Sequence, residues 1–135
     1  MKRILIIEDE PDIVDICTIV LEKEGYEVFT FTDFIGYQSI INAVDANLVL
    51  LDLNIRGHHG KEICRYIKQH DNLKQTKVIL MSANPDIQTV KNEVEADEYI
   101  SKPFDIEHLL ATVGVLINLP HCHPSALKPD GNALM

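Results

Sequence analysis

The sequence lacks tryptophan, has only three cysteines, and is short of positive charge. It carries 12 lysine and arginine residues against 21 aspartate and glutamate residues, a net charge of −9. The cysteines are odd in number, widely spaced and form no C-x-x-C pair, which excludes a disulfide framework or a thiolate zinc site. The shortage of basic residues argues against a nucleic-acid-binding surface, because phosphate binding needs clustered lysine and arginine.

Long apolar runs are absent as well. No run approaches the roughly 18 residues of a transmembrane helix, and Lys2 and Arg3 precede only four apolar residues before an acidic stretch, which is no signal peptide. We therefore expect a cytoplasmic protein without membrane contact. A chain of 135 residues with 46% hydrophobic content suits one domain with its own core.

Short apolar runs alternate with longer segments of helical periodicity. We predict strands at 4–7, 28–31, 48–51, 78–81 and 99–100. We predict helices at 11–24, after an Asp33 cap through 44, from a loop at 54–60 to about 70, from Pro85 to 94, and at 106–116. Three strand runs are continuously apolar, as in strands covered on both faces. The pattern predicts an α/β fold, a (βα)5 doubly wound sheet of five parallel strands with the flavodoxin-like order 2-1-3-4-5.

Residues 119–135 differ from the rest of the chain, because they hold three of the six prolines and show no periodicity. We predict one domain over 1–118, and a flexible tail or the start of a linker over 119–135. A first strand at residue 4 fits a natural start. The sequence leaves open whether the chain continues past residue 135.

Chemically active side chains follow four of the predicted strands. Glu8 and Asp9 follow the first strand, Asp52 the third, Ser82 the fourth and Lys102 the fifth. Carboxyl ends of parallel strands share one edge, so we expect these groups to converge. Three neighbouring carboxylates need a cation, and hard oxygen ligands favour Mg²⁺ completed by a phosphoryl oxygen. A carboxylate beside a divalent cation and a lysine can attack phosphorus, which predicts phosphoryl transfer to an aspartate.

Four segments carry a resemblance to a known family. They are 7–11 (IEDEP), 50–54 (LLDLN), 81–83 (MSA) and 96–104 (ADEYISKPF). In this order and at this spacing, the chain resembles the receiver domain of two-component response regulators over residues 1–118. The resemblance implies that Asp52 is the phosphoacceptor. It implies that Asp9 binds Mg²⁺ directly, that Glu8 acts through water and that Asn54 gives a backbone carbonyl; Mn²⁺ is an alternative ion.

The resemblance also implies a switch. Ser82 would hydrogen-bond the phosphoryl group, Lys102 would pair with it across a cis Lys102–Pro103 peptide, and Tyr99 would turn inward on phosphorylation. The phosphoryl group would come from a sensor histidine kinase or a histidine phosphotransfer protein. The face made by the fourth helix, fifth strand and fifth helix would then control an unidentified partner or a missing effector domain. Phosphorylation-dependent homodimerisation is a further option. The only catalysis implied is Mg²⁺-dependent phosphorylation and dephosphorylation of the domain itself.

The sequence departs from the family pattern at three places. Glu8 stands where aspartate is commoner, and Glu95 replaces a frequent glycine. Arg56, four residues after Asp52, stands where proline is usual, so we expect the loop 56–60 to be more mobile than is typical.

Alternative interpretations stay open at this point. Ser82 could simply cap the fourth helix, and a receiver fold could serve as a binding module without phosphorylation. A Mg²⁺-dependent toprim-like enzyme also places glutamate after its first strand. Such an enzyme would need Asp-x-Asp where Asp52-Leu53-Asn54 stands, and a basic surface that this chain lacks.

Overall fold

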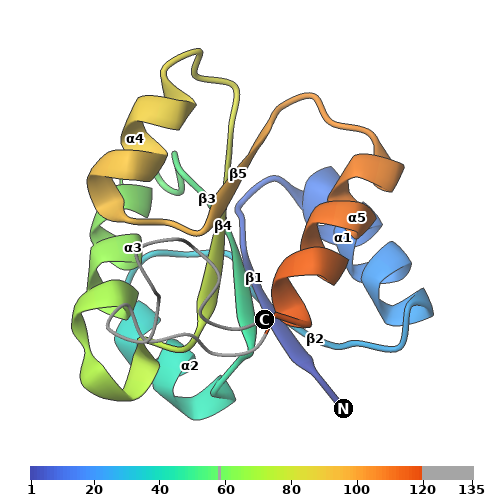
Figure 1. The fold of residues 1–135 in the computed structure, drawn as a ribbon, viewed down its shortest axis with the longest axis horizontal. Helices are drawn as coiled ribbons and strands as arrows, with labels where there is room; N and C mark the ends of the chain where they lie inside the picture. The colour runs from blue at the N-terminus through green and yellow to red at the C-terminus, as the bar shows by residue number, and fades with distance from the viewer. Residues whose placement is uncertain (58, 120–135) are drawn as a thin grey trace, which may run out of the picture.

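A computed structural model describes residues 1–57 and 59–119. Five strands form one parallel sheet in the order β2-β1-β3-β4-β5, which confirms the predicted fold class and strand order (Figure 1). The strands are β1 (Arg3–Ile7), β2 (Glu27–Phe31), β3 (Leu48–Asp52), β4 (Lys77–Ser82) and β5 (Glu98–Ser101).

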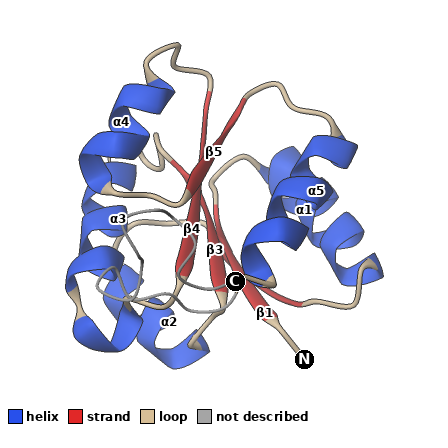
Figure 2. Cartoon of the chain, viewed as in Figure 1, coloured by secondary structure: helices blue, strands red, loops and turns tan. Residues whose placement is uncertain are grey.

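Helices cover both faces of the sheet. They are α1 (Pro11–Lys23), α2 (Tyr37–Val44), α3 (Gly60–Gln69), the 3-10 helix η1 (Asp71–Leu73), α4 (Ile87–Val94) and α5 (Ile106–Ile117). Helices α1 and α5 lie on one face and α2, α3 and α4 on the other (Figure 2). Among the described residues, no helix has both the length and the apolar content to cross a membrane.

Each strand supplies side chains to two separate hydrophobic clusters, because successive residues of a strand point to opposite faces. Ile4 and Ile6 pack with residues of α1 and α5, whereas Leu5 and Ile7 pack with residues of α2, α3 and α4. This two-sided burial explains why the apolar runs show no alternation. In the central strand β3 all five residues are buried.

Two predicted helix starts are wrong. Asp33 does not cap α2, because its Oδ1 accepts the N–H of Phe34 at 2.7 Å and the helix begins only after Gly36, whose φ is 84°. Helix α4 starts at Ile87 rather than at Pro85. In both cases the chain makes an additional turn before it enters the helix, and no side-chain cap marks that entry.

Glu95 ends α4 in the left-handed conformation, with a φ of 61°. Glycine adopts this conformation without steric cost and is favoured just after a helix. The geometry therefore explains why glycine is frequent at this position in the family that the chain resembles.

Candidate functional site

The carboxyl ends of four strands bring the predicted site residues together. Glu8 and Asp9 follow β1, Asp52 ends β3, Ser82 ends β4, and Lys102 follows β5. Backbone pairing holds these ends in place, since the N–H of Lys102 donates to the carbonyl of Ser82 at 2.8 Å. The Lys102–Pro103 peptide is cis, as the resemblance implies.

Glu8, Asp9 and Asp52 form a cluster of carboxylates. Each offers one oxygen, and these oxygens all lie within 4.8 Å of one another. Glu8 has no exposed surface, Asp52 is 4% exposed, and Asp9 is half-buried. Carboxylates this close repel one another unless a cation intervenes. Because all three donors are hard oxygens, the cluster could hold a metal ion of the Mg²⁺ type.

Lys102 neutralises part of this charge. Its Nζ lies 2.9 Å from Glu8 Oε1, 3.3 Å from Glu10 Oε1 and 3.5 Å from Asp52 Oδ1. Burial works to lower the pKa of Lys102, but the hydrogen bond to Glu8 and the charge of Asp52 outweigh it and raise the pKa above its usual value. The lysine is therefore a permanent cation beside the carboxylates.

Burial works in the other direction on Glu8, because it disfavours the charged form of an acid. It raises the pKa of Glu8 to about 7, against the lowering effect of the Lys102 hydrogen bond and together with the negative charge of Asp52. The second carboxylate oxygen, Oε2, accepts the N–H groups of Asp9 at 3.0 Å and Glu10 at 3.2 Å. Glu8 thus connects the start of α1 to Lys102.

Asn54 and Ser82 complete the rim of the cluster. The N–H of Asn54 donates to Asp52 Oδ1 at 3.1 Å, which orients the carboxylate at the end of β3. Ser82 is 1% exposed, and its Oγ accepts the N–H of Asn84 at 2.9 Å. Ser82 is not the cap of α4, because that position belongs to Asp86.

Tyr99 lies on β5, on the face that α4 covers. Its ring is half-buried against the hydrophobic cluster of that face, and its hydroxyl donates to Gln88 Oε1 of α4 at 3.1 Å. Tyr99 therefore joins β5 to α4 in this conformation. No contact between Tyr99 and the carboxylates occurs among the interactions of the described residues.

Sequence reasoning missed two contributors to the site. Glu10 lies within 3.3 Å of Lys102, and the backbone N–H of Arg56 donates to Asp9 Oδ2 at 3.3 Å. The adjoining acids Glu8 and Asp9 were a signal for Glu10. No sequence signal existed for Arg56, because its contribution comes from the backbone.

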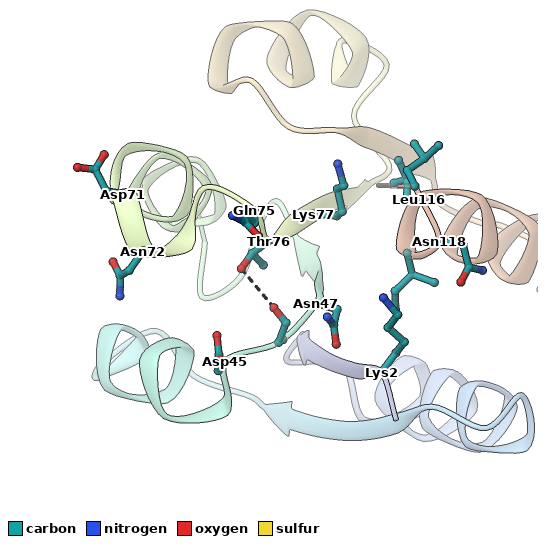
Figure 3. A pocket seen from close by; sticks show the side chains of 13 residues that line it. Lys2, Asp45, Asn47, Asp71, Asn72, Gln75, Thr76, Lys77, Leu116 and Asn118 are labelled. Atoms are coloured by element: carbon teal, nitrogen blue, oxygen red, sulfur yellow. Dashed lines mark hydrogen bonds between the residues drawn. The ribbon is translucent and has the colours of Figure 1, made fainter. Parts of the chain in front are cut away.

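A polar hollow of about 600 Å³ lies at the opposite, amino end of the sheet, where Lys2, Asn47 and Lys77 contribute to its wall (Figure 3). Its buried hydroxyl, that of Thr76, already donates to the carbonyl of Ala46 at 3.2 Å. The hollow is therefore separate from the carboxylate cluster and lacks its chemistry.

Comparisons with known proteins agree with this geometry. A family model described as the response regulator receiver domain matches residues 4–114. The DNA-binding dual master transcriptional regulator RpaA of Synechocystis is 34% identical over 130 residues, which are 95% of this chain and 54% of that protein. The chain therefore spans about half the length of this curated relative.

Solved structures are similar over most of the described fold. Response regulator TrrA of Thermotoga maritima, in complex with Mg(2+)-BeF, is 32% identical with a TM-score of 0.76, covering 86% of this chain and 99% of that one. Chemotaxis protein CheY4 of Vibrio cholerae is 23% identical with a TM-score of 0.78, covering 86% and 98%, and supports the fold alone. The toprim-like alternative finds no support in these matches. The chain belongs to the family of response regulator receiver domains.

Proposed function

We propose that Asp52 accepts a phosphoryl group from a phosphohistidine of a sensor histidine kinase or histidine phosphotransfer protein. The observation that carries this proposal is the position of Asp52: a buried carboxylate at the end of β3, 3.5 Å from the Lys102 ammonium and clustered with Glu8 and Asp9. A carboxylate oxygen of Asp52 forms the new bond to phosphorus, the bond from phosphorus to the donor imidazole breaks, and the imidazole takes up a proton from water.

Glu8, Asp9, Asp52 and the backbone carbonyl of Asn54 would hold Mg²⁺, or Mn²⁺ in its place. When bound, the ion supplies neutralisation of the charge on the phosphoryl oxygens. Support comes from the three clustered carboxylates and from the similarity to TrrA, whose structure was solved with Mg(2+)-BeF. The chain's own task is to orient the carboxylates, which the N–H of Asn54 does for Asp52.

Phosphorylation would reorganise contacts that exist in the described structure. Lys102 exchanges its bonds to Glu8 and Glu10 for a bond to the phosphoryl group, and Ser82 Oγ turns from the N–H of Asn84 toward the same group. The movement of Ser82 relaxes the start of α4, so Tyr99 leaves Gln88 and turns inward. The face made by α4, β5 and α5 then changes shape, and phosphorylation shifts the population toward that state.

The phosphodonor would dock in an apolar groove beside the carboxylates. The groove measures about 560 Å³, and its apolar wall comes from α1, α5 and the loops after β4 and β5: Ile13, Ile16, Ala83, Pro103, Phe104 and Ile106. Lys102 and Glu10 also line it, so the groove adjoins the carboxylate cluster directly. A helix of the donor protein that fills this groove would bring its phosphohistidine to Asp52.

The output and the setting are proposals as well. We propose that the receiver domain spans 1–118 and that residues from 119 onward form a tail or linker, although 120–135 lie outside the described residues. RpaA, at nearly twice the matched length, is a DNA-binding regulator, which favours an effector domain joined to this receiver domain. A separate partner protein and a phosphorylation-dependent homodimer are the other ways in which the signal could be delivered. We expect the cytoplasm as the compartment, and no direct binding of nucleic acid or membrane by this domain. Catalysis is limited to its own phosphorylation and dephosphorylation.

Mass spectrometry after treatment with acetyl phosphate and Mg²⁺ tests the central proposal. Wild-type protein should gain the mass of one phosphoryl group, and Asp52→Asn should gain none. Omitting Mg²⁺ by adding a chelator should also prevent the gain. An undiminished gain in Asp52→Asn, or none in the wild type, would show that Asp52 is not the acceptor.

A further inference from the structure

The loop between β3 and α3 is tied to the loop between β2 and α2 at two points. Arg56 Nε lies 3.5 Å from Asp33 Oδ1. The ring of His59 stacks on the ring of Phe34, with centroids 3.7 Å apart and an interplanar angle of 19°. Asp33 and Phe34 are consecutive, whereas Arg56 and His59 lie before and after the turn at Gly57. The two contacts therefore hold both sides of this turn against one short segment of the loop between β2 and α2.

Arg56 also reaches the carboxylate cluster. Its backbone N–H donates to Asp9 Oδ2 at 3.3 Å. One residue therefore contacts the candidate metal site through its backbone and the neighbouring loop through its side chain.

The backbone of Arg56 needs this support. Its φ is 48° and that of Gly57 is 102°, so two consecutive residues adopt the left-handed conformation. Glycine does so freely, but a side chain with a Cβ does so only at a cost that surrounding contacts must offset. Asp33 is prepared as a partner, because the N–H of Phe34, with a further contribution from the charge of Arg56, lowers the pKa of Asp33 against the opposing effect of desolvation.

We propose that Arg56 is a positioning residue for the metal ligand Asp9, held in place by Asp33 and by the stacking of His59 on Phe34. The inference rests on the metal site of the proposed function. An amide that already holds Asp9 orients the carboxylate before the ion arrives, so less ordering opposes binding. On this proposal Arg56 orders the loop, whereas the absence of proline led us to expect a looser one.

Charge alone makes a different prediction. If Arg56 acted only through its positive charge, Arg56→Gln would tighten binding of a cation and Asp33→Asn would weaken it. If Arg56 acts by positioning, both variants weaken binding. The double variant, Arg56→Gln with Asp33→Asn, should then lose no more affinity than the single variant that binds the ion less tightly. Either substitution alone already breaks the shared contact.

Calorimetric titration with Mn²⁺ at about pH 8 tests the proposal; the chain has no tryptophan for a fluorescence titration. Arg56→Gln and Asp33→Asn should each weaken binding about two- to fivefold, as expected of an exposed ion pair. His59→Ala, which removes the stacking on Phe34, should weaken it about two- to tenfold. Arg56→Lys should bind more tightly than Arg56→Gln, the reverse of a pure charge effect.

The pair Lys74 and Asp71 provides matched controls. Lys74 Nζ lies 3.0 Å from Asp71 Oδ1 near η1, at the other end of the sheet. Lys74→Gln and Asp71→Asn remove the same charges, and should leave Mn²⁺ binding unchanged. Arg56→Gln that binds Mn²⁺ as tightly as wild type, additive losses in the double variant, or equal losses in the controls would overturn the proposal. A wild-type protein that binds no Mn²⁺ would instead refute the metal site itself.

Discussion

Lys102 lies closer to Glu8 than to Asp52. Its Nζ is 2.9 Å from Glu8 Oε1 and 3.5 Å from Asp52 Oδ1. The lysine therefore balances a buried glutamate in the unphosphorylated chain, in addition to facing the proposed phosphoacceptor. This relationship links the stability of the domain to the chemistry of the site.

Lys102→Met should destabilise the metal-free protein at about pH 8. The variant leaves Glu8, which has no exposed surface, without its cation, and removal of one partner of a buried ion pair costs about 3 kcal/mol. Urea unfolding in the presence of a chelator measures the loss. Replacing both partners, Lys102→Met with Glu8→Gln, should recover only part of it, because Glu8 is then uncharged while the buried Asp52 still lacks the lysine. A single variant within about 1 kcal/mol of the wild type would contradict this account.

In the metal-free protein, the contribution of Glu8 to the free energy of unfolding should fall as the pH rises from about 5 to about 7. The folded-state pKa of Glu8 is raised from 4.5 to about 7, mainly by burial, so in this window the folded chain keeps a proton that the unfolded chain has lost. The contribution is complete below the unfolded pKa and is lost as the pH rises through the folded one. For a shift of this size it amounts to at most about 3 kcal/mol.

Urea titrations of wild type and Glu8→Gln across this pH range, both with chelator, isolate the contribution of Glu8. The free energy of unfolding of the wild type should fall relative to that of the variant between about pH 5 and pH 7. A constant difference across the window would mean that the pKa of Glu8 is not raised.

Ile16→Glu should slow phosphotransfer from a protein donor while leaving acetyl phosphate unaffected. Ile16 lines the apolar groove and is 41% exposed, so a charge there would be desolvated by a docked helix but not by a small molecule. We expect a loss of about tenfold, equivalent to about 1.4 kcal/mol of docking energy. Ile19→Glu is the matched control, since Ile19 is 55% exposed on the same helix and is not among the groove residues. Equal losses in both variants would contradict docking of the phosphodonor in this groove.

Gly60→Ala should destabilise the fold by about 2 kcal/mol, as overpacking does. A Cβ at Gly60 would overlap the backbone of Leu53, the residue after Asp52. Gly114→Ala is the matched control: it lies within α5 with open space around it and should stabilise the helix by about 0.5–1 kcal/mol. Thermal or urea unfolding compares the two. A neutral Gly60→Ala would show that the start of α3 can move away from Leu53.

Much of the site could be predicted from the sequence because of one physical rule. Apolar runs identify buried parallel strands, and the residues just after such strands lie at one edge of the sheet. This rule placed Asp52, Ser82 and Lys102 near one another although they are far apart in the chain. It works because backbone pairing, rather than side-chain detail, determines where a strand ends.

The remaining features depend on geometry that composition does not specify. The Asp33 carboxylate accepts the next N–H in the chain instead of capping α2, and both outcomes suit an aspartate before a helix. Likewise, the left-handed backbone of Arg56 brings its N–H to Asp9, and nothing about an arginine indicates such a conformation. Local choices of this kind depend on contacts with distant residues.

The burial of β3 determines where a signal can leave the molecule. This strand has no exposed residue and is bonded to β1 on one side and β4 on the other, so on the proposed function it is poorly placed to shift when phosphorylation makes Asp52 more negative by about one charge. On the proposed function we expect the displacement in β5 and in the short helix α4 beside it; β5, like β2, has a neighbouring strand on one side only, and Lys102 follows it. Phosphorylation would then occur in the most constrained part of the sheet, and a partner would detect it at a less constrained edge.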